Sequence, residues 1–119
     1  MIKYHRTSDN IIAELTDMHF IMNESQDALD LMAEIGNHKC NRLIIREYNL
    51  NSNFFDLKTG FAGEILQKFS NYDVKLAIIG DFKKFNSKSL QDFIRECNRR
   101  NLILFSEDLK TALSKLTKK

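Results

Sequence analysis

The sequence predicts a single α/β domain spanning residues 1–119, with a mixed, largely parallel β-sheet, an N-terminal hairpin and helices packed on the sheet. A length of 119 residues suits one domain and is short for two. The composition, 43% hydrophobic and 29% charged, is that of an ordinary globular protein. Beyond the hairpin, short apolar runs alternate with segments whose apolar residues recur at helical spacing, an order that favours a parallel sheet.

The chain opens with two short extended runs, residues 2–6 and 10–15. The polar cluster Thr7-Ser8-Asp9 separates them and is typical of a hairpin turn, so the opening pair is predicted to be antiparallel. Residues 18–22 are a candidate for a further short strand.

The first helix is expected to begin at Asn23 or Ser25, whose side-chain oxygens can accept a bond from a free backbone N–H. Its end is predicted at Gly36-Asn37. Its apolar face consists of Ala28, Leu29, Leu31, Met32 and Ile35. The next run, residues 42–46, is apolar between charged ends, the pattern of a central strand buried on both faces.

Two further helix and strand pairs and a last helix complete the chain. A second helix is predicted from Thr59, a strand over residues 74–79, a third helix opened by Ser87 or Ser89, a strand over 102–105, and a last helix capped by Ser106. The apolar faces of the three helices are Phe61, Ala62, Ile65, Leu66 and Phe69; Leu90, Phe93, Ile94 and Cys97; and Leu109, Ala112, Leu113 and Leu116. Right-handed crossovers would make the last three strands parallel neighbours, and their loops would meet at one edge of the sheet, where ligands usually bind.

Composition argues against several classes of function. Lysine and arginine number 18 against 16 acidic residues, and the basic residues are spread along the chain, so we expect no nucleic-acid partner. The chain opens without an apolar leader, and no stretch approaches the roughly 18 apolar residues that cross a bilayer. We therefore expect a cytoplasmic protein with no membrane partner. Cys40 and Cys97 fall in a turn and on a helix face, which does not suggest a disulfide.

Several blocks of sequence resemble the bacterial domain-of-unknown-function family 4180. They are residues 26–33 (QDALDLMA), 54–60 (FFDLKTG), 62–69 (AGEILQKF), 74–78 with 80–82, and 87–90 with 92–94. The resemblance covers nearly the whole chain. That family has no established function, so the resemblance does not imply an activity.

More distantly, the strand at residues 43–45, the loop at 56–60 and the helix after it resemble the STAS domain of sulfate transporters and anti-sigma-factor antagonists. In those antagonists, a partner kinase phosphorylates the hydroxyl residue that precedes a glycine at the start of this helix. Thr59 before Gly60 takes that place here, although Asp56 stands further from Thr59 than in the family pattern. The resemblance implies a STAS-like fold and a regulatory role.

Thr59 has two interpretations. Phosphate at a helix N-terminus would meet free N–H groups and the positive end of the helix dipole, and Lys58 would add a countercharge. The alternative is that Thr59 caps the helix through the same geometry. Asp56 and Gly60 complete this candidate site.

A second candidate helix start, at Ser87, Lys88 and Ser89, follows the next strand, and it could bind a small anionic ligand. It could equally be a capping motif with solvated charges. Asp81 follows Gly80 at the end of that strand. Asp81 and Asp56 could form a carboxylate pair for acid–base chemistry, or could close local turns through their side chains.

No phosphate-binding glycine loop, Gly-x-Ser-x-Gly elbow or paired Cys-x-x-Cys occurs in the sequence, and the three histidines are scattered. We therefore expect no metal, no cofactor and no enzyme activity. The favoured function is a STAS-like regulatory module whose partner is a protein or kinase. A small-molecule or nucleotide-binding protein, which could be an enzyme, is the alternative, and self-association through the hairpin edge is a third.

Overall fold

The computed structural model describes residues 1–117, which form one five-stranded sheet in the order β1-β2-β3-β4-β5. The strands are β1 (Ile2–Arg6), β2 (Ile11–Leu15), β3 (Arg42–Arg46), β4 (Lys75–Ile79) and β5 (Ile103–Ser106). β1 is antiparallel to β2, and every later neighbour is parallel. The predicted mixed, largely parallel sheet with an N-terminal hairpin is confirmed.

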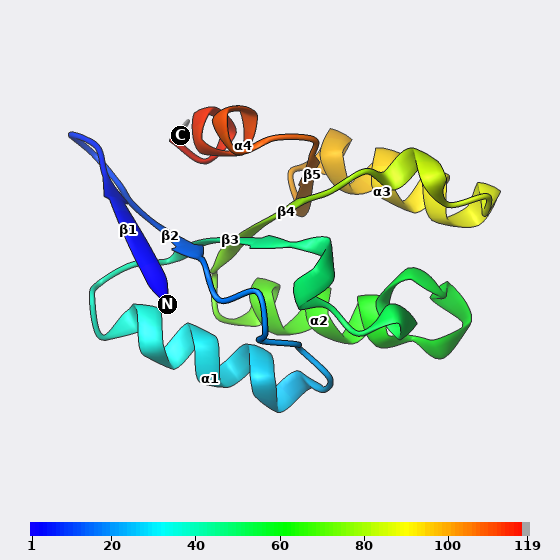
Figure 1. Cartoon of the computed structure of the whole chain (residues 1–119), viewed down its shortest axis with the longest axis horizontal. Coiled ribbons are helices and arrows are strands. Elements are labelled where there is room, and N and C mark those ends of the chain that lie inside the picture. Colours follow the sequence, from blue (N-terminus) through cyan, green and yellow to red (C-terminus); the bar gives the residue numbers. More distant parts are fainter. Residues whose placement is uncertain (118–119) are drawn as a thin grey trace.

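Four helices cover the sheet: α1 (Ser25–Gly36), α2 (Phe61–Asn71), α3 (Lys88–Arg100) and α4 (Leu109–Thr117). From β2 onwards the strands stand side by side in chain order, so right-handed crossovers place the intervening helices on one face. Accordingly, α1, α2 and α3 contribute to one hydrophobic cluster, and α4 packs alone on the opposite face. Figure 1 shows α1 and α2 below the sheet and α4 above it.

Alternating residues of each strand supply the two clusters. In β3, Leu43 and Ile45 face the three helices, whereas Ile44 faces α4, and all three side chains are fully buried. A strand buried on both faces needs apolar residues at consecutive positions, which is what the run between Arg42 and Arg46 provides. β3 is the middle strand of the sheet, as the sequence predicts.

Residues 18–22 do not form the short strand considered from the sequence. Met22 makes a single isolated bridge with Leu50, residues 18 and 19 form a turn, and residues 20 and 21 have no regular structure. The buried side chain of Asn49 explains this, because its Nδ2 donates to the carbonyls of Asp17 and Phe20 at 3.0 and 2.9 Å. An amide side chain thus satisfies backbone groups that a strand would pair in a ladder.

Two predicted helix caps are also wrong. α1 is closed by Asp27 in its first turn, whose Oδ2 accepts bonds from the backbone N–H groups of Asn23 and Glu24. α4 is capped by Asp108, whose Oδ1 accepts from Thr111 N at 2.7 Å, whereas Ser106 is the last residue of β5. In both helices an aspartate carboxylate is the group that reaches free N–H groups at the start of the helix, and the Ser106 hydroxyl instead donates to the carbonyl of Asp108.

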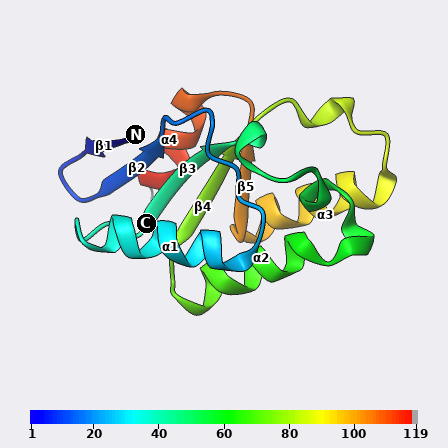
Figure 2. The ribbon, with the colours of Figure 1, turned by 60° about the horizontal axis from the view of Figure 1, so that its bottom comes forward.

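The parallel strands give the sheet two different edges, which Figure 2 allows the reader to follow. β2 to β5 end at what we call the carboxyl edge, formed mainly by residues 16–24, 47–60 and 80–87. They begin at the amino edge, where α1, α2 and α3 end. No helix among residues 1–117 is long and apolar enough to span a bilayer.

Candidate functional site

The carboxyl edge carries every residue that the sequence singles out for binding, and all eight of these side chains or backbones are exposed. They are Asp56, Lys58, Thr59, Gly60, Asp81, Ser87, Lys88 and Ser89. They lie in two loops, one between β3 and α2 and the other between β4 and α3. The expectation that parallel strands bring these loops to one edge is met by the topology.

The first loop contains three short 3₁₀ turns before α2, which are Glu47–Asn49, Ser52–Phe55 and Leu57–Thr59. Asp56 Oδ1 accepts a bond from Lys58 N at 3.2 Å, which closes the third turn. Gly60 then adopts φ +78, a left-handed conformation that glycine reaches without steric cost, and α2 begins at the next residue. Asp56 is therefore a turn-closing residue.

Thr59 uses its hydroxyl to hold this loop together. Its Oγ1–H is shared between the carbonyls of Asn53 and Asp56, at 2.8 and 2.9 Å, and Oγ1 accepts from Phe61 N at 3.2 Å. The hydroxyl thus joins the loop to the first residue of α2, but the N-cap of α2 is Gly60, so Thr59 is not the helix cap that the sequence suggested. Its exposed position leaves it within reach of another protein.

The second loop repeats the same device. Asp81 Oδ1 accepts from Lys83 N at 3.3 Å and closes a 3₁₀ turn, and Ser87 Oγ accepts from Leu90 N at 3.1 Å and caps α3. Lys88 pairs with Asp92 one turn along α3, at 3.3 Å. Asp56 and Asp81 therefore each bond their own local backbone, which is the turn-forming role and not that of a carboxylate pair.

Glu47, at the end of β3, ties the second loop to the sheet. Its Oε1 accepts from Asp81 N at 3.0 Å, and its Oε2 lies 2.7 Å from Lys84 Nζ. The backbone at Gly80 passes so close that a Cβ there would lie 2.8 Å from Glu47 Oε1. Gly80 is thus required for close approach, and the end of β4 is fixed against the end of β3.

Phenylalanine side chains fill the space between the two loops. Phe55 stacks on Phe85 with ring centroids 4.7 Å apart, and it also approaches Phe82 at 6.2 Å. Phe54 is fully buried beneath them and packs on Phe61 and on Phe105 of β5. Of the two adjacent aromatics, Phe54 plugs the end of the core and Phe55 is half-buried.

Apolar side chains are exposed at the neighbouring part of the same edge. Met18 and Ile21 precede α1, and Tyr48 follows β3; they are 64%, 47% and 48% exposed. Asn49, Met22 and Asn51 hydrogen-bond these two loops together through backbone and side-chain groups. The carboxyl edge therefore combines exposed apolar groups with a polar region of fixed turns.

A buried charge network that the sequence reasoning missed lies on the α4 side of β1, β2 and β3. Glu14 Oε1 accepts from His5 Nε2 at 2.8 Å, and its Oε2 lies 2.7 Å from Arg46 Nη1. Burial raises the pKa of Glu14, but the hydrogen bonds from His5 and Arg46 outweigh that effect, and the pKa is lowered overall. Glu14, a charged residue within the apolar sequence IIAEL of β2, is the feature of the sequence that could have indicated this network.

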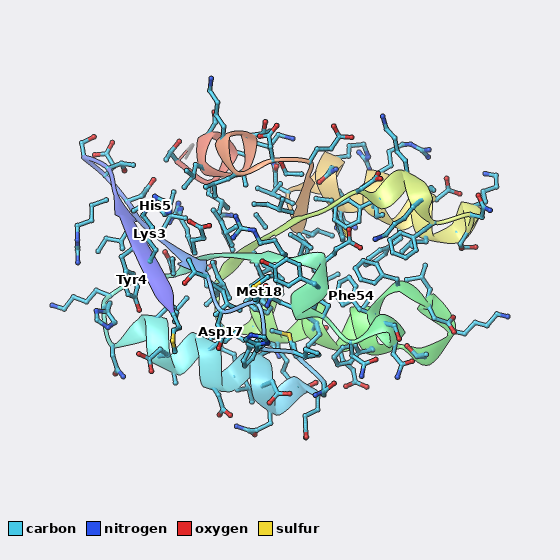
Figure 3. All side chains as sticks on the ribbon, in the orientation of Figure 1. Lys3, Tyr4, His5, Asp17, Met18 and Phe54 are labelled. Atoms are coloured by element: carbon cyan, nitrogen blue, oxygen red, sulfur yellow. The ribbon has the colours of Figure 1, made fainter. Side chains whose placement is uncertain are left out.

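This network joins three strands and offers little surface to a substrate. Figure 3 shows Tyr4 on the α1 side of β1 and His5 on the other side. Glu14 is only 6% exposed, and both of its oxygens are occupied. The arrangement stabilises the hairpin on the sheet, because each partner compensates the cost of burying the carboxylate.

The cysteines lie apart, one before β3 and the other on α3, and both are buried. Burial raises the pKa of the Cys97 thiol, which keeps it protonated. Cys40 Sγ lies 3.2 Å from the carbonyls of Ile11 and Arg42. Within residues 1–117, no group of three or more histidine, cysteine or acidic side chains is arranged to hold a metal ion.

The fold and its carboxyl edge define an α/β domain with a mixed five-stranded sheet and an edge of fixed, exposed turns. A family model described as "Domain of unknown function (DUF4180)" matches residues 7–116, and the chain belongs to this family. No curated protein and no solved structure matches the chain. The more distant likeness to STAS domains is not shown by these comparisons.

Proposed function

We propose that this protein is a non-enzymatic regulatory module, of the kind that STAS domains represent, which binds another protein through the carboxyl edge. The observation that carries the proposal is the exposure of Met18, Ile21 and Tyr48 beside the fixed polar loops at 56–60 and 81–89. Exposed apolar groups with a polar rim are characteristic of protein-binding surfaces. The fixed turns would reduce the loss of loop entropy on binding.

The alternative, a phosphate-bearing small molecule at this edge, has less support. Three of its lysines are already paired, Lys83 with Glu107, Lys84 with Glu47 and Lys88 with Asp92. The phenylalanines that fill the space between the loops leave less room for a ligand there, whereas ligand sites are concave. A partner with its own extended surface suits this edge better.

Phosphorylation of Thr59 is a proposed means of regulating this surface. A phosphate there would remove the hydroxyl hydrogen that Asn53 and Asp56 now accept, and the first turn of α2 and Lys58 would attract the new charge. The loop would rearrange within the proposed interface. Peptide mapping of protein from its own cells tests this, with phosphate on Thr59 as the expected result and an unmodified Thr59 across growth conditions as the contrary one.

The interaction itself is tested with two matched tyrosine variants. Tyr48 and Tyr72 are both exposed, at 48% and 62%, but Tyr48 lies at the carboxyl edge and Tyr72 at the opposite end of α2. We expect Tyr48→Ser to lose a stoichiometric partner that copurifies with the wild-type chain, and Tyr72→Ser to retain it. Equal retention by both variants, or a wild-type chain that purifies alone, would contradict the proposal.

A further inference from the structure

A cavity of about 350 Å³ lies at the amino edge, at the far end of β4 and β5 from the surface proposed above. Leu102, which is half-buried, and Leu104, which is 7% exposed, provide its apolar lining, and Leu76 borders it with a side chain that is only 1% exposed. Its volume is within the range of sites that hold small organic molecules. The lining alone would suit any compact apolar ligand.

Two lysines add a charge preference to this cavity. Lys75 comes from the start of β4 and Lys115 from the last turn of α4, so different elements bring the two ammonium groups to one hollow. Neither has an ion-pair partner within residues 1–117, whereas Lys83, Lys84 and Lys88 at the carboxyl edge do. Asp73 lines an adjoining hollow with Lys75 but not this cavity. The cavity itself is therefore positively charged.

The backbone around the cavity limits the kinds of anion that the cavity could bind. α3 and α4 both end here, so the cavity lacks the free N–H groups of a helix start that phosphate groups use, and the negative ends of the two helix dipoles offset part of the lysine charge. The end of α3 is also closed, because Asn101 N donates to the carbonyl of Asn98 and Leu102 N donates to the carbonyl of Cys97. The Asn98 side-chain amide already bonds the backbone N–H and carbonyl of Phe105. The Asn101 side chain makes no hydrogen bond within the described residues, so its amide is free to bind a ligand.

We propose that this cavity binds a small monocarboxylate with a compact apolar body. The carboxylate would lie between the Lys75 and Lys115 ammonium groups and accept a bond from the Asn101 amide, and the apolar body would contact Leu102 and Leu104. A singly charged group matches two lysines that stay partly in water, and the leucines favour an acid with a ring or short chain over a fully polar one.

Titration of the ¹⁵N-labelled chain with benzoate, followed by amide chemical shifts, tests the proposal. We expect saturable shifts centred on Leu76, Asn101, Leu102 and Leu104, with a dissociation constant in the millimolar range or below. Benzyl alcohol, which keeps the ring but not the charge, should bind at least severalfold more weakly. Inorganic phosphate should also bind at least severalfold more weakly than benzoate. Absent or unsaturable shifts, shifts centred elsewhere, or equal binding of either control compound would overturn the proposal.

Charge-neutral variants separate a specific site from general attraction. The double variant Lys75→Gln, Lys115→Gln should weaken benzoate binding by about tenfold, the effect of losing two partly exposed ion pairs. Lys110→Gln removes the same kind of charge from an exposed position on α4 that does not line the cavity, and it should bind as the wild type does. Equal losses in the two proteins would overturn the site, and thermal unfolding of each variant verifies that the fold is retained.

Discussion

Short polar side chains at the carboxyl edge close turns with the same atoms that a ligand would otherwise contact. Asp56, Asp81 and Ser87 each accept a bond from a backbone N–H two or three residues further on. Asx turns and N-caps of this kind follow from local sequence alone. At the scale of single residues, the sequence was therefore a good guide to conformation.

Thr59→Ala should lower the free energy of unfolding by about 1 kcal/mol, because the hydroxyl that joins Asn53 and Asp56 to α2 is lost. Thr59→Ser keeps the hydroxyl and should stay within about 0.5 kcal/mol of the wild type. Urea unfolding measures both. If Thr59→Ala were as stable as Thr59→Ser, the hydroxyl would not be holding the loop.

Glu14→Gln should change how the free energy of unfolding depends on pH. The pKa of Glu14 is lowered in the folded protein, despite burial, by its bonds to His5 and Arg46. The wild-type stabilisation from Glu14 is therefore present above the ordinary glutamate pKa and is lost as the pH falls through the lowered value. We expect the difference in unfolding free energy between wild type and Glu14→Gln to be largest at neutral pH and to shrink in acid. A difference that stayed constant down to about pH 3 would contradict this assignment.

At the scale of elements, the alternation of apolar runs and helical segments was enough to predict each strand and helix. The errors lie at element ends, at the caps of α1 and α4 and at residues 18–22. These depend on which of several polar side chains reaches the backbone, and Asn49 does so from a loop that lies 29 and 32 positions away. A local pattern contains no information about such a contact.

The contact between Glu47, after β3, and the end of β4 can be tested by replacing two glycines with alanine. Gly80→Ala should lower the free energy of unfolding by about 1 to 3 kcal/mol, since its Cβ would press on Glu47 and displace the bonds to Asp81 and Lys84. Gly63→Ala, in α2 with open space around the new Cβ, should raise it by about 0.5 to 1 kcal/mol. Chemical denaturation of both variants distinguishes the effect of close packing at Gly80 from the effect of helix propensity at Gly63. A neutral Gly80→Ala would show that Glu47 does not fix the loop.

At the scale of the whole molecule, topology decides what surfaces exist. Right-handed crossovers in chain order put three helices on one face of the sheet, and α4 alone covers part of the opposite face. The charge network around Glu14 lies on that opposite face. The sequence could locate the edge where the candidate loops meet, since parallel strands end together. It could not show that Phe55, Phe82 and Phe85 fill the space between those loops, because they come together only in the folded chain.

The most direct test of protein binding at the carboxyl edge is lysine cross-linking with mass spectrometry, carried out in the cells that make this protein. The exposed lysines Lys58, Lys83 and Lys88 mark the carboxyl edge, and Lys75 and Lys115 mark the amino edge. We expect cross-links to another protein from the first group of lysines and few from the second. Cross-links to a partner that come mainly from Lys75 and Lys115, or an absence of cross-links to any other protein, would contradict this expectation.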